Sequence, residues 1–206
     1  MEMTCNSTEY DKIAEKIFGP IYVDIAKAII LRTNVKEGDL LDLGCGGGHL
    51  GFAMGELGDY KLNFSDIREE ALNITKERAE KNNVKANYVQ SDVHNLKMED
   101  NSFDIVVSRG SMPFWDDQKK AFSEIYRVLK PGGWAYIGGG LGGAKHQERI
   151  RAMKKANGGP DCFDRSKSKS LSTDEYVNMF KEWNAEYIVV ENHDEGRWFA
   201  FRKREL

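Results

Sequence analysis

The chain has 206 residues, of which 40% are hydrophobic and 31% charged, and its formal net charge at pH 7 is -3. These are the values of a globular protein, and the length suits one domain that buries a core of ordinary size. The small negative charge gives no general electrostatic reason to bind nucleic acid or an anionic membrane, so we expect neither as a partner.

The N-terminus and the cysteines predict a cytoplasmic protein. Residues 1–11 are polar and lack the apolar core of a signal peptide, and no stretch approaches the roughly 20 apolar residues of a spanning helix. The three cysteines, Cys5, Cys45 and Cys162, are an odd number without metal-ligand spacing, which suits reduced thiols and no metal site. A pair of Cys5 and Cys162 that holds a metalloid such as arsenite is an alternative with no motif behind it.

The first predicted elements are helical. Apolar residues recur at helical spacing through residues 9–32, and Gly19-Pro20 interrupts them. We therefore predict two short helices before the first strand, within a capping segment of residues 1–36.

The middle of the chain alternates between strand and helix patterns. Strands are predicted at 39–44, 60–65, 86–90, 103–108 and 133–138, and helices at 49–57, 68–82, 117–129 and 144–157. This alternation is typical of a doubly wound α/β fold.

The last third of the chain departs from that alternation. Residues 155–172 are polar and aperiodic, which predicts a mobile loop whose lysines either attract an acidic substrate or form a solvated face. A helix is predicted at 173–183, followed by strands at 186–190 and 197–201 joined by Asn192–Gly196 as a hairpin.

The most informative segment is Leu40–Gly51, where an apolar strand runs into Asp42 and then a glycine-rich turn that opens a helix. Gly44, Gly46 and Gly48 permit a tight turn and let a ligand lie against bare main chain. Asp42, at the strand end, can take a cationic amine. Asp66 ends the next strand 18 residues after Gly48, about the 20 expected of an acid that binds a ribose diol.

Three further segments separate the possible cofactors. Tyr88–Val93 ends a strand with an acid, Asn101–Ser108 enters a strand through Phe-Asp, and Arg127–Trp134 is a helix end followed by Pro-Gly-Gly. Together with Asp42-x-Gly44-x-Gly46-x-Gly48, they resemble the class I S-adenosylmethionine-dependent methyltransferases over residues 38–140. The resemblance is to the small-molecule group that includes the quinone-biosynthesis C-methyltransferases.

The resemblance implies a fold and a cofactor. The fold is a Rossmann-like, doubly wound, mostly parallel seven-stranded sheet with a reversed last strand and helices on both faces. The cofactor is S-adenosylmethionine, bound by the 38–140 core of a single 1–206 domain, with substrate-side helices and the hairpin in 141–206.

The resemblance also assigns roles to cofactor-binding residues. The amides of Gly44 to Gly48, with Cys45 as a small residue that fits, receive the methionyl carboxylate together with the helix that begins near His49. Asp66 binds the ribose hydroxyls with Ile67 against the adenine, and Asp92 accepts from the exocyclic amine beside the Val93 amide. The open alternatives are a helix N-cap for Asp66 and a solvated turn for Asp92.

The acceptor is expected beyond the fourth strand, at Ser108-Arg109-Gly110-Ser111. This tetrapeptide is not Asn/Asp-Pro-Pro-Tyr/Phe, and no Pro-Cys pair is present, which disfavours nucleic-acid and glutamine methylation. Ser108 and Arg109 are counted with the cofactor site, and Arg109 either holds an acidic or enolate substrate or pairs with Asp116 or Asp117.

Other residues have two interpretations each. His146, just after the glycines at 138–140, 142 and 143, is a candidate general base or a surface histidine. Phe114 and Trp115 form an apolar wall or core. Four further aromatic residues line the cap or belong to the core: Tyr10, Tyr22, Trp183 and Trp198.

The predicted function is transfer of a methyl group from S-adenosylmethionine to a small-molecule acceptor by in-line displacement. The alternatives are a catalytically silent S-adenosylmethionine-binding module, or partner protein, and an NAD-type oxidoreductase. The oxidoreductase shares the glycine-rich turn and Asp66 but leaves Phe103-Asp104, Pro131-Gly132-Gly133 and the hairpin unexplained. The sequence sets neither the acceptor nor the oligomeric state.

Overall fold

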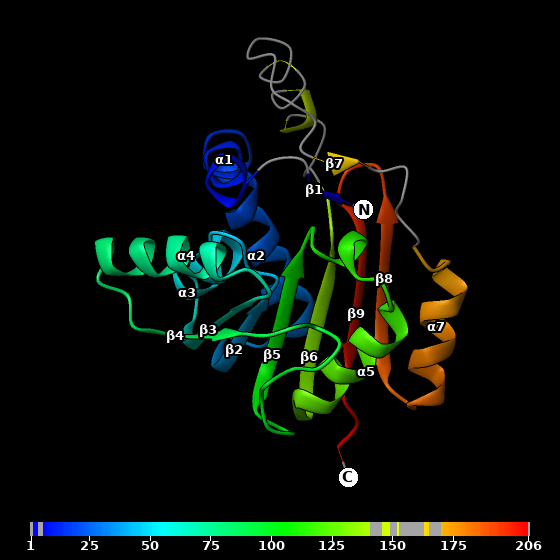
Figure 1. Ribbon diagram of the computed structural model, residues 1–206. Coiled ribbons are helices and arrows are strands. Elements are labelled where there is room, and N and C mark those ends of the chain that lie inside the picture. The colour runs from blue at the N-terminus through cyan, green and yellow to red at the C-terminus, as the bar shows by residue number, and fades with distance from the viewer. Residues whose placement is uncertain are drawn as a thin grey trace.

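The structure is a computed structural model that describes residues 2–3, 6–140, 146–148, 152, 163–164 and 170–205. Its centre is a seven-stranded sheet with the strand order β4-β3-β2-β5-β6-β9-β8 (Figure 1). The strands are β2 (Glu37–Leu43), β3 (Asp59–Asp66), β4 (Ala86–Gln90), β5 (Phe103–Arg109), β6 (Leu129–Gly139), β8 (Glu186–Asn192) and β9 (Gly196–Arg202).

The pairing of these strands confirms the predicted fold class. The pairs β2–β3, β2–β5, β3–β4 and β5–β6 are parallel, whereas β9 is antiparallel to both β6 and β8. The hairpin therefore inserts its last strand, reversed, between β6 and β8. The strand order changes direction at β2, whose neighbours are β3 and β5, and a crevice at such a point is where open α/β sheets bind ligands.

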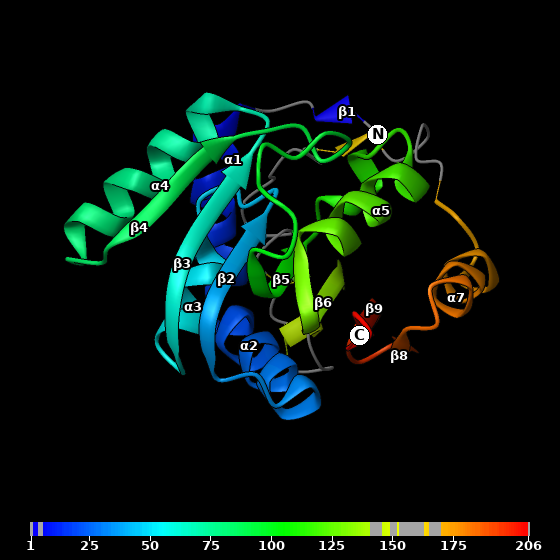
Figure 2. The same cartoon turned by 90° about the horizontal axis from the view of Figure 1, so that it is seen from below.

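Helices cover both faces of the sheet (Figure 2). The helices α2 (Gly19–Thr33), α3 (His49–Gly55) and α4 (Glu69–Lys81) lie on one face, and α5 (Gln118–Val128) and α7 (Thr173–Glu182) on the other. Successive strand residues pack into opposite faces: Leu40 contributes to the core under α2 and α3, and Leu41 to the core under α5 and α7. This alternation of faces is what two covered sides of one sheet require.

Several helix starts follow from local side-chain capping. Asn6 and Glu9 form a reciprocal capping box at the start of α1 (Ser7–Ile13), and Ser172 and Glu175 do the same for α7. The Asp117 side chain accepts from the Lys120 amide and so caps α5.

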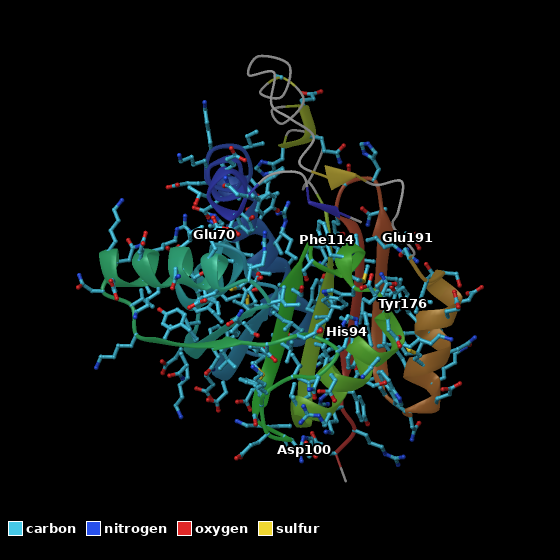
Figure 3. All side chains as sticks on the ribbon, viewed as in Figure 1. Glu70, His94, Asp100, Phe114, Tyr176 and Glu191 are labelled. Atoms are coloured by element: carbon cyan, nitrogen blue, oxygen red, sulfur yellow. The ribbon has the colours of Figure 1, made fainter. Side chains whose placement is uncertain are left out.

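The N-terminal helices differ from the prediction at their junction. The predicted break at Gly19-Pro20 is a change of helix type, because a π-helical stretch, Ala14–Phe18, connects α1 to α2 without leaving the helical path. Pro20 lies in the first turn of α2, where a missing N–H costs no intrahelical hydrogen bond. The segment is fastened to α4, since Glu70 accepts from the Ser7 amide and the Thr8 hydroxyl (Figure 3).

Two other elements differ from the prediction. β6 begins at Leu129 rather than at 133, because Leu129 pairs with Phe103 and the Pro-Gly-Gly segment is tied to the last strand by hydrogen bonds between Gly132, Gly133 and Lys203. The pair β1 (Glu2–Met3) and β7 (Phe163–Asp164) was not foreseen. The predicted helix 144–157 is helical at 146–148 and 152, and the rest of it lies outside the described residues, as does most of the predicted 155–172 loop.

Candidate functional site

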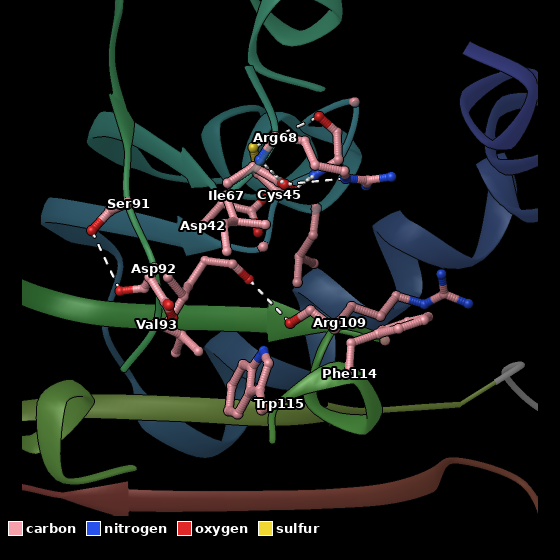
Figure 4. Close-up of a pocket in the computed structure, with 18 of the residues that line it drawn as sticks. Asp42, Cys45, Ile67, Arg68, Ser91, Asp92, Val93, Arg109, Phe114 and Trp115 are labelled. Atoms are coloured by element: carbon pink, nitrogen blue, oxygen red, sulfur yellow. Dashed lines mark hydrogen bonds and ion pairs between the residues drawn. The ribbon is translucent and has the colours of Figure 1, made fainter. Parts of the chain in front are cut away.

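A cavity of about 320 Å³ opens where β2, β3, β4 and β5 end (Figure 4). Of the predicted cofactor residues, Gly48 and Ser108 lie behind its lining, and the others line it: Asp42, Gly44, Cys45, Gly46, Asp66, Ile67, Asp92, Val93 and Arg109. One cavity therefore collects side chains from residues more than sixty positions apart in the sequence.

The glycine-rich turn is held in place by its own backbone. The Cys45 amide donates to the Ser65 carbonyl at 3.0 Å, and the Gly48 amide donates to the Cys45 carbonyl at 2.8 Å. Gly48 has φ +76°, and a Cβ there would meet the Thr75 methyl at 2.7 Å, so both its conformation and its space require glycine. The turn is thus preformed, and three of its amides, those of Cys45, Gly46 and Gly48, already donate within the protein.

Asp66 joins the turn to the end of β3. Its Oδ2 accepts from the Gly46 amide at 3.0 Å, and its Oδ1 accepts from the Arg68 amide at 3.0 Å. The predicted N-cap role is wrong, because the N-cap of α4 is Arg68 and Asp66 lies two residues earlier. Oδ1 also accepts from Arg68 Nε at 3.5 Å, and Oδ2 keeps a second lone pair, so the side chain retains acceptor capacity for a ligand.

Asp42 is the most buried carboxyl group of the cavity, with 2% of its surface exposed. Its Oδ2 accepts from the Gly51 amide at 2.8 Å. Burial, with a further contribution from the charge of Asp66, raises the pKa of Asp42 to about 7 despite the Gly51 hydrogen bond. A buried carboxyl group with a raised pKa favours the binding of a cation, because a positive charge beside it stabilises its ionised form.

Asp92 follows β4 on the next rim of the cavity. Its Oδ1 accepts from the His94 amide at 2.9 Å and lies 2.7 Å from His94 Nδ1. The hydrogen bond from the His94 amide outweighs partial burial and lowers the pKa of Asp92, so this acid is ionised. Ile67 is 60% exposed beside it, whereas Val93 is buried. The site thus pairs an exposed apolar surface with an ionised acceptor.

Arg109 projects from the end of β5 between aromatic rings. Its Nη1 donates to the Tyr22 hydroxyl at 3.1 Å and its Nη2 to the Gly140 carbonyl at 3.0 Å. The guanidinium carbon lies 4.9 Å from the centroids of both the Phe18 and the Tyr22 rings. Its hydrogen bonds go to a phenol and a carbonyl, so the predicted alternative of a pair with Asp116 or Asp117 is not what the structure contains.

The predicted aromatic residues divide into two groups. Tyr10, Tyr22, Phe114 and Trp115 line the cavity. Trp183 and Trp198 do not: Trp183 packs between Tyr126 and Phe201, and Trp198 is buried against Tyr136. The last two belong to the packing of the hairpin.

His146 lies away from this cavity. Its Nε2 is 2.9 Å from Asp24 Oδ2, and it lines a separate hollow of about 110 Å³ with Arg32 and Tyr136. Ser108 is buried, and its Oγ is 2.5 Å from Ser111 Oγ, which does line the cavity. Cys5 and Cys162, together with Leu141, Gly142 and Gly143, lie outside the described residues.

Sequence reasoning missed a histidine in the cavity wall. His49, the first residue of α3, lines the cavity, and its Nε2 is 2.9 Å from Asp11 Oδ1. Asp11 also pairs with Arg78, which in turn donates to the Gly47 carbonyl. The position of His49 directly after Gly48 was a usable signal, but nothing in the sequence joins Asp11 to it.

Two features are absent from the described part of the chain. No group of three or more His, Cys, Asp or Glu side chains within it is arranged to hold a metal ion. None of its helices has the length and apolarity needed to span a bilayer.

Comparisons with known proteins agree on one family. The family described as "Methyltransferase domain" matches residues 41–137. A ribosomal protein L11 methyltransferase of Dictyoglomus thermophilum is 34% identical over 129 residues, covering 62% of this chain and 41% of that protein. A ubiquinone/menaquinone biosynthesis C-methyltransferase of Francisella philomiragia is 31% identical over 132 residues, covering 62% of this chain and 53% of that protein. The chain spans about half, or less, of the length of these curated relatives.

A solved structure matches along nearly the whole chain. It is a protein of Methanococcus maripaludis named as a candidate S-adenosyl-L-methionine-dependent methyltransferase, with 34% identity, a TM-score of 0.84, and coverage of 97% of this chain and 93% of that one. A methyltransferase structure from Aquifex aeolicus, 19% identical with a TM-score of 0.64 over 96% of this chain, shares the fold. With its glycine-rich turn, its acids at successive strand ends and these matches, the chain belongs to the S-adenosylmethionine-dependent methyltransferases.

Proposed function

We propose that this protein transfers a methyl group from S-adenosylmethionine to a small-molecule acceptor bound in the same cavity. The observation that carries the proposal is the convergence of Asp42, Asp66 and Asp92 from the ends of three neighbouring strands around one glycine-rich turn. A cavity of about 320 Å³ lies in the range of roughly 300–1,000 Å³ typical of small-molecule sites.

The residues present fit S-adenosylmethionine. Asp42 is a buried acid with one hydrogen-bond donor, which suits the ammonium of the methionyl part. Asp66 and Asp92 are carboxylates with acceptor capacity left, which suits the ribose hydroxyls and the adenine amine. Ile67 offers its exposed side chain to the adenine face, beside the Val93 amide. When bound, S-adenosylmethionine supplies a methyl group on a positively charged sulfur.

The other side of the cavity has the features of an acceptor site. Tyr22, Phe114 and Trp115 present apolar surface that excludes water, and Arg109 adds a fixed positive charge at the end of β5. A methyl transfer depends mainly on the alignment of the acceptor with the bond that breaks and on the exclusion of water, and a rigid aromatic wall serves both.

We further propose that residues 1–206 act as one methyltransferase domain. Residues 38–140 would bind the cofactor, residues 1–36 would cap it, and residues 141–206 would supply the substrate side and the hairpin. The ion pair of Asp11 with Arg78 supports the capping role, because it fastens α1 to the helix that follows Asp66.

Calorimetric titration with S-adenosylmethionine, S-adenosylhomocysteine and NAD tests the proposal. We expect micromolar binding of the first two and none of NAD, because the cavity offers acids for an amine and two hydroxyls, and the Cys45, Gly46 and Gly48 amides already donate within the protein rather than to a pyrophosphate. Binding of NAD alone would overturn the proposal. A screen of small-molecule acceptors with radiolabelled methyl donor then follows, and turnover of none of them would favour a silent module.

A further inference from the structure

The cavity contains a histidine that is fixed by a buried carboxylate. Asp11 comes from α1 and His49 opens α3, and the 2.9 Å between Asp11 Oδ1 and His49 Nε2 is a hydrogen-bond distance. Each side chain is only 12% exposed. In Figure 1, α1 lies at the end of the sheet toward which β5 points, which is the end that holds the cavity.

The charge on Asp11 determines which ring nitrogen carries the hydrogen. Burial alone would raise the pKa of Asp11, but the hydrogen bonds from His49 and Arg78 and the charge of Arg78 outweigh burial and lower it to about 2. Asp11 is therefore ionised at neutral pH and can only accept hydrogen bonds. Nε2 of His49 must then donate, which leaves the lone pair of the neutral ring on Nδ1.

Nδ1 is the free nitrogen of a ring in the cavity wall. Within the described part of the chain no hydrogen bond to it is found, and it is not among the buried atoms that lack a partner. The ring stacks on Tyr22 at 5.0 Å and 16°, and the Arg109 guanidinium lies 4.9 Å from the same Tyr22 ring. The imidazole and the guanidinium therefore pack on the same Tyr22 ring, and their distance is at most roughly 10 Å.

We propose that His49, oriented by Asp11, is the general base of this cavity, and that the acceptor is a phenol or an enol. The inference rests on the proposed function and specifies its substrate class. The arrangement is that of a base whose second nitrogen is bound by a carboxylate, which fixes the tautomer and stabilises the imidazolium that forms. Arg109 is the positive charge that stabilises the oxyanion.

The acceptor's hydroxyl proton passes to His49 Nδ1. The resulting oxyanion, or the ring carbon conjugated with it, would form the new bond to the methyl carbon as the carbon–sulfur bond breaks, and that electron pair would leave with the sulfur. On an aromatic ring, the hydrogen of the methylated carbon would then move to the oxygen and restore the phenol. The imidazolium then returns its proton to water, so that no oxidant or reductant is needed.

Charged and titratable groups around the ring come from five elements. They are Asp11 of α1, Tyr22 of α2, Asp42 of β2, Arg78 of α4 and Arg109 of β5. Arg78 shares the charge of Asp11 at 2.9 Å, and the oxyanion of the acceptor adds a second negative charge beside the ring. Proton transfer and anion binding are therefore coupled.

The test uses 4-nitrophenol, whose phenolate absorbs visibly, with the protein saturated with S-adenosylhomocysteine. In the wild-type protein, we expect the bound probe to ionise at pH values below the pKa of the free phenol, with an apparent shift of about one unit, a tenfold change. His49→Asn should lose this shift, and Asp11→Asn should reduce it. The matched control is His193→Asn, in the exposed hairpin turn, which should behave as wild type.

Each other outcome contradicts the inference. They are no saturable spectral change in the wild-type protein, an unchanged shift in His49→Asn, or an Asp11→Asn variant that is less stable but keeps the full shift, which would mean that the pair is only structural. Calorimetry of S-adenosylhomocysteine with the same variants distinguishes failure of this inference from failure of the proposed function. If S-adenosylhomocysteine binds and the phenol shift does not depend on His49, only the inference fails.

A second readout is the nitrogen chemical shifts of the imidazole rings in long-range proton–nitrogen spectra. The chain has four histidines, so single His→Asn variants assign the signals. We expect His49 to carry its hydrogen on Nε2 and to become doubly protonated when 4-nitrophenol binds. A ring protonated on Nδ1, or one unaffected by the phenol, would contradict the assignment of the base.

Discussion

The buried carboxyl group of Asp42 is proposed to bind a ligand but lowers the stability of the folded protein when it is ionised. This loss of stability can be measured as a dependence of the free energy of unfolding on pH. Its pKa in the folded protein, about 7, lies above the ordinary value of 3.8, so the folded state holds the proton more tightly than the unfolded state. The resulting stability is fully present below about pH 4 and is lost as the pH rises through about 7. Asp42→Asn lacks this loss and can still accept from the Gly51 amide.

We therefore expect Asp42→Asn to be more stable than wild type at about pH 8, by on the order of a few kcal/mol, and to show little advantage near pH 4. Chemical denaturation across this range measures the difference, and calorimetry should show weaker S-adenosylmethionine binding because the negative charge is gone. Asp92→Asn is the control, since its lowered pKa predicts no such gain. A pH-independent difference for Asp42→Asn would contradict the argument.

Gly46→Val should abolish S-adenosylmethionine binding through the backbone. Gly46 has φ +55°, and a side chain there has space but imposes strain of about 1–2 kcal/mol on the turn. Relaxing that strain breaks the hydrogen bond from the Gly46 amide to Asp66, so the two ligand-binding elements separate. Asp66→Ala should have the same effect on calorimetric affinity.

Gly132→Val is the matched control for Gly46→Val. It introduces the same kind of backbone strain, at φ +81°, in the turn before Gly133 and outside the cavity lining, where the added Cβ lies 3.0 Å from the flexible end of the Glu205 side chain. We expect it to reduce stability and leave the affinity for S-adenosylmethionine unchanged. Wild-type affinity for S-adenosylmethionine in both Gly46→Val and Asp66→Ala would show that the glycine-rich turn is not part of the binding site.

At the residue scale, the sequence indicated the groups that follow strands and missed those that pair across the chain. Asp42, Asp66 and Asp92 are predictable because the carboxyl ends of parallel strands meet at one edge of the sheet. The Asp11–His49 pair is not, because the docking of α1 beside α4, which brings Asp11 to His49, depends on tertiary contacts with no periodic signal. His146 was wrongly expected near the cleft. It follows the glycines at 138–140 closely in sequence, but its side chain lines a separate hollow.

At the scale of elements, the buried carboxylate of Asp11 contributes to the docking of α1 beside α4. Asp11 pairs with Arg78 and His49, and its depressed pKa, about 2, contributes stability that is present above about pH 4 and lost as the pH falls toward 2. Asp11→Ala should therefore weaken the docking of α1 by about 1–3 kcal/mol, somewhat less than the loss of a partner in a fully buried pair.

Hydrogen exchange of residues 6–18 measures this docking. We expect lower protection factors in Asp11→Ala at neutral pH and a similar loss of protection in wild type near pH 2, with α3 and α4 less affected. Glu15→Ala is the control: Glu15 lies 3.9 Å from Arg78 and is 70% exposed, so its removal should change nothing measurable. Unchanged protection of α1 in Asp11→Ala would mean that apolar packing alone holds the helix.

Element boundaries were predictable where one local signal dominated. β4 occupies residues 86–90 as predicted, between the end of α4 and the turn at Asp92. β6 begins four residues early because pairing with Phe103 and with the last strand outweighs the Pro-Gly-Gly turn signal. The π-helical stretch 14–18 leaves no pattern in the sequence, since it depends on how α1 must be offset to reach α4.

At the scale of the whole molecule, the two cores share their strands. Leu40, Ile105 and Ala200 face the core under α2 and α3, and their neighbours Leu41, Val106 and Phe201 face the core under α5 and α7. Neither core can lose its packing while the sheet remains intact, so we expect one calorimetric unfolding transition.

S-adenosylhomocysteine should move that single transition upward as a whole. The cavity lies where β2 and β5 diverge, so a ligand there contacts strands that feed both cores. At about 100 times its dissociation constant, it should add about 3 kcal/mol, or about 5–10 °C in a domain of this size, and NAD should add nothing. Differential scanning calorimetry checks this. Two transitions, of which the ligand shifts only one, would mean that the cofactor edge and the hairpin edge of the sheet unfold independently.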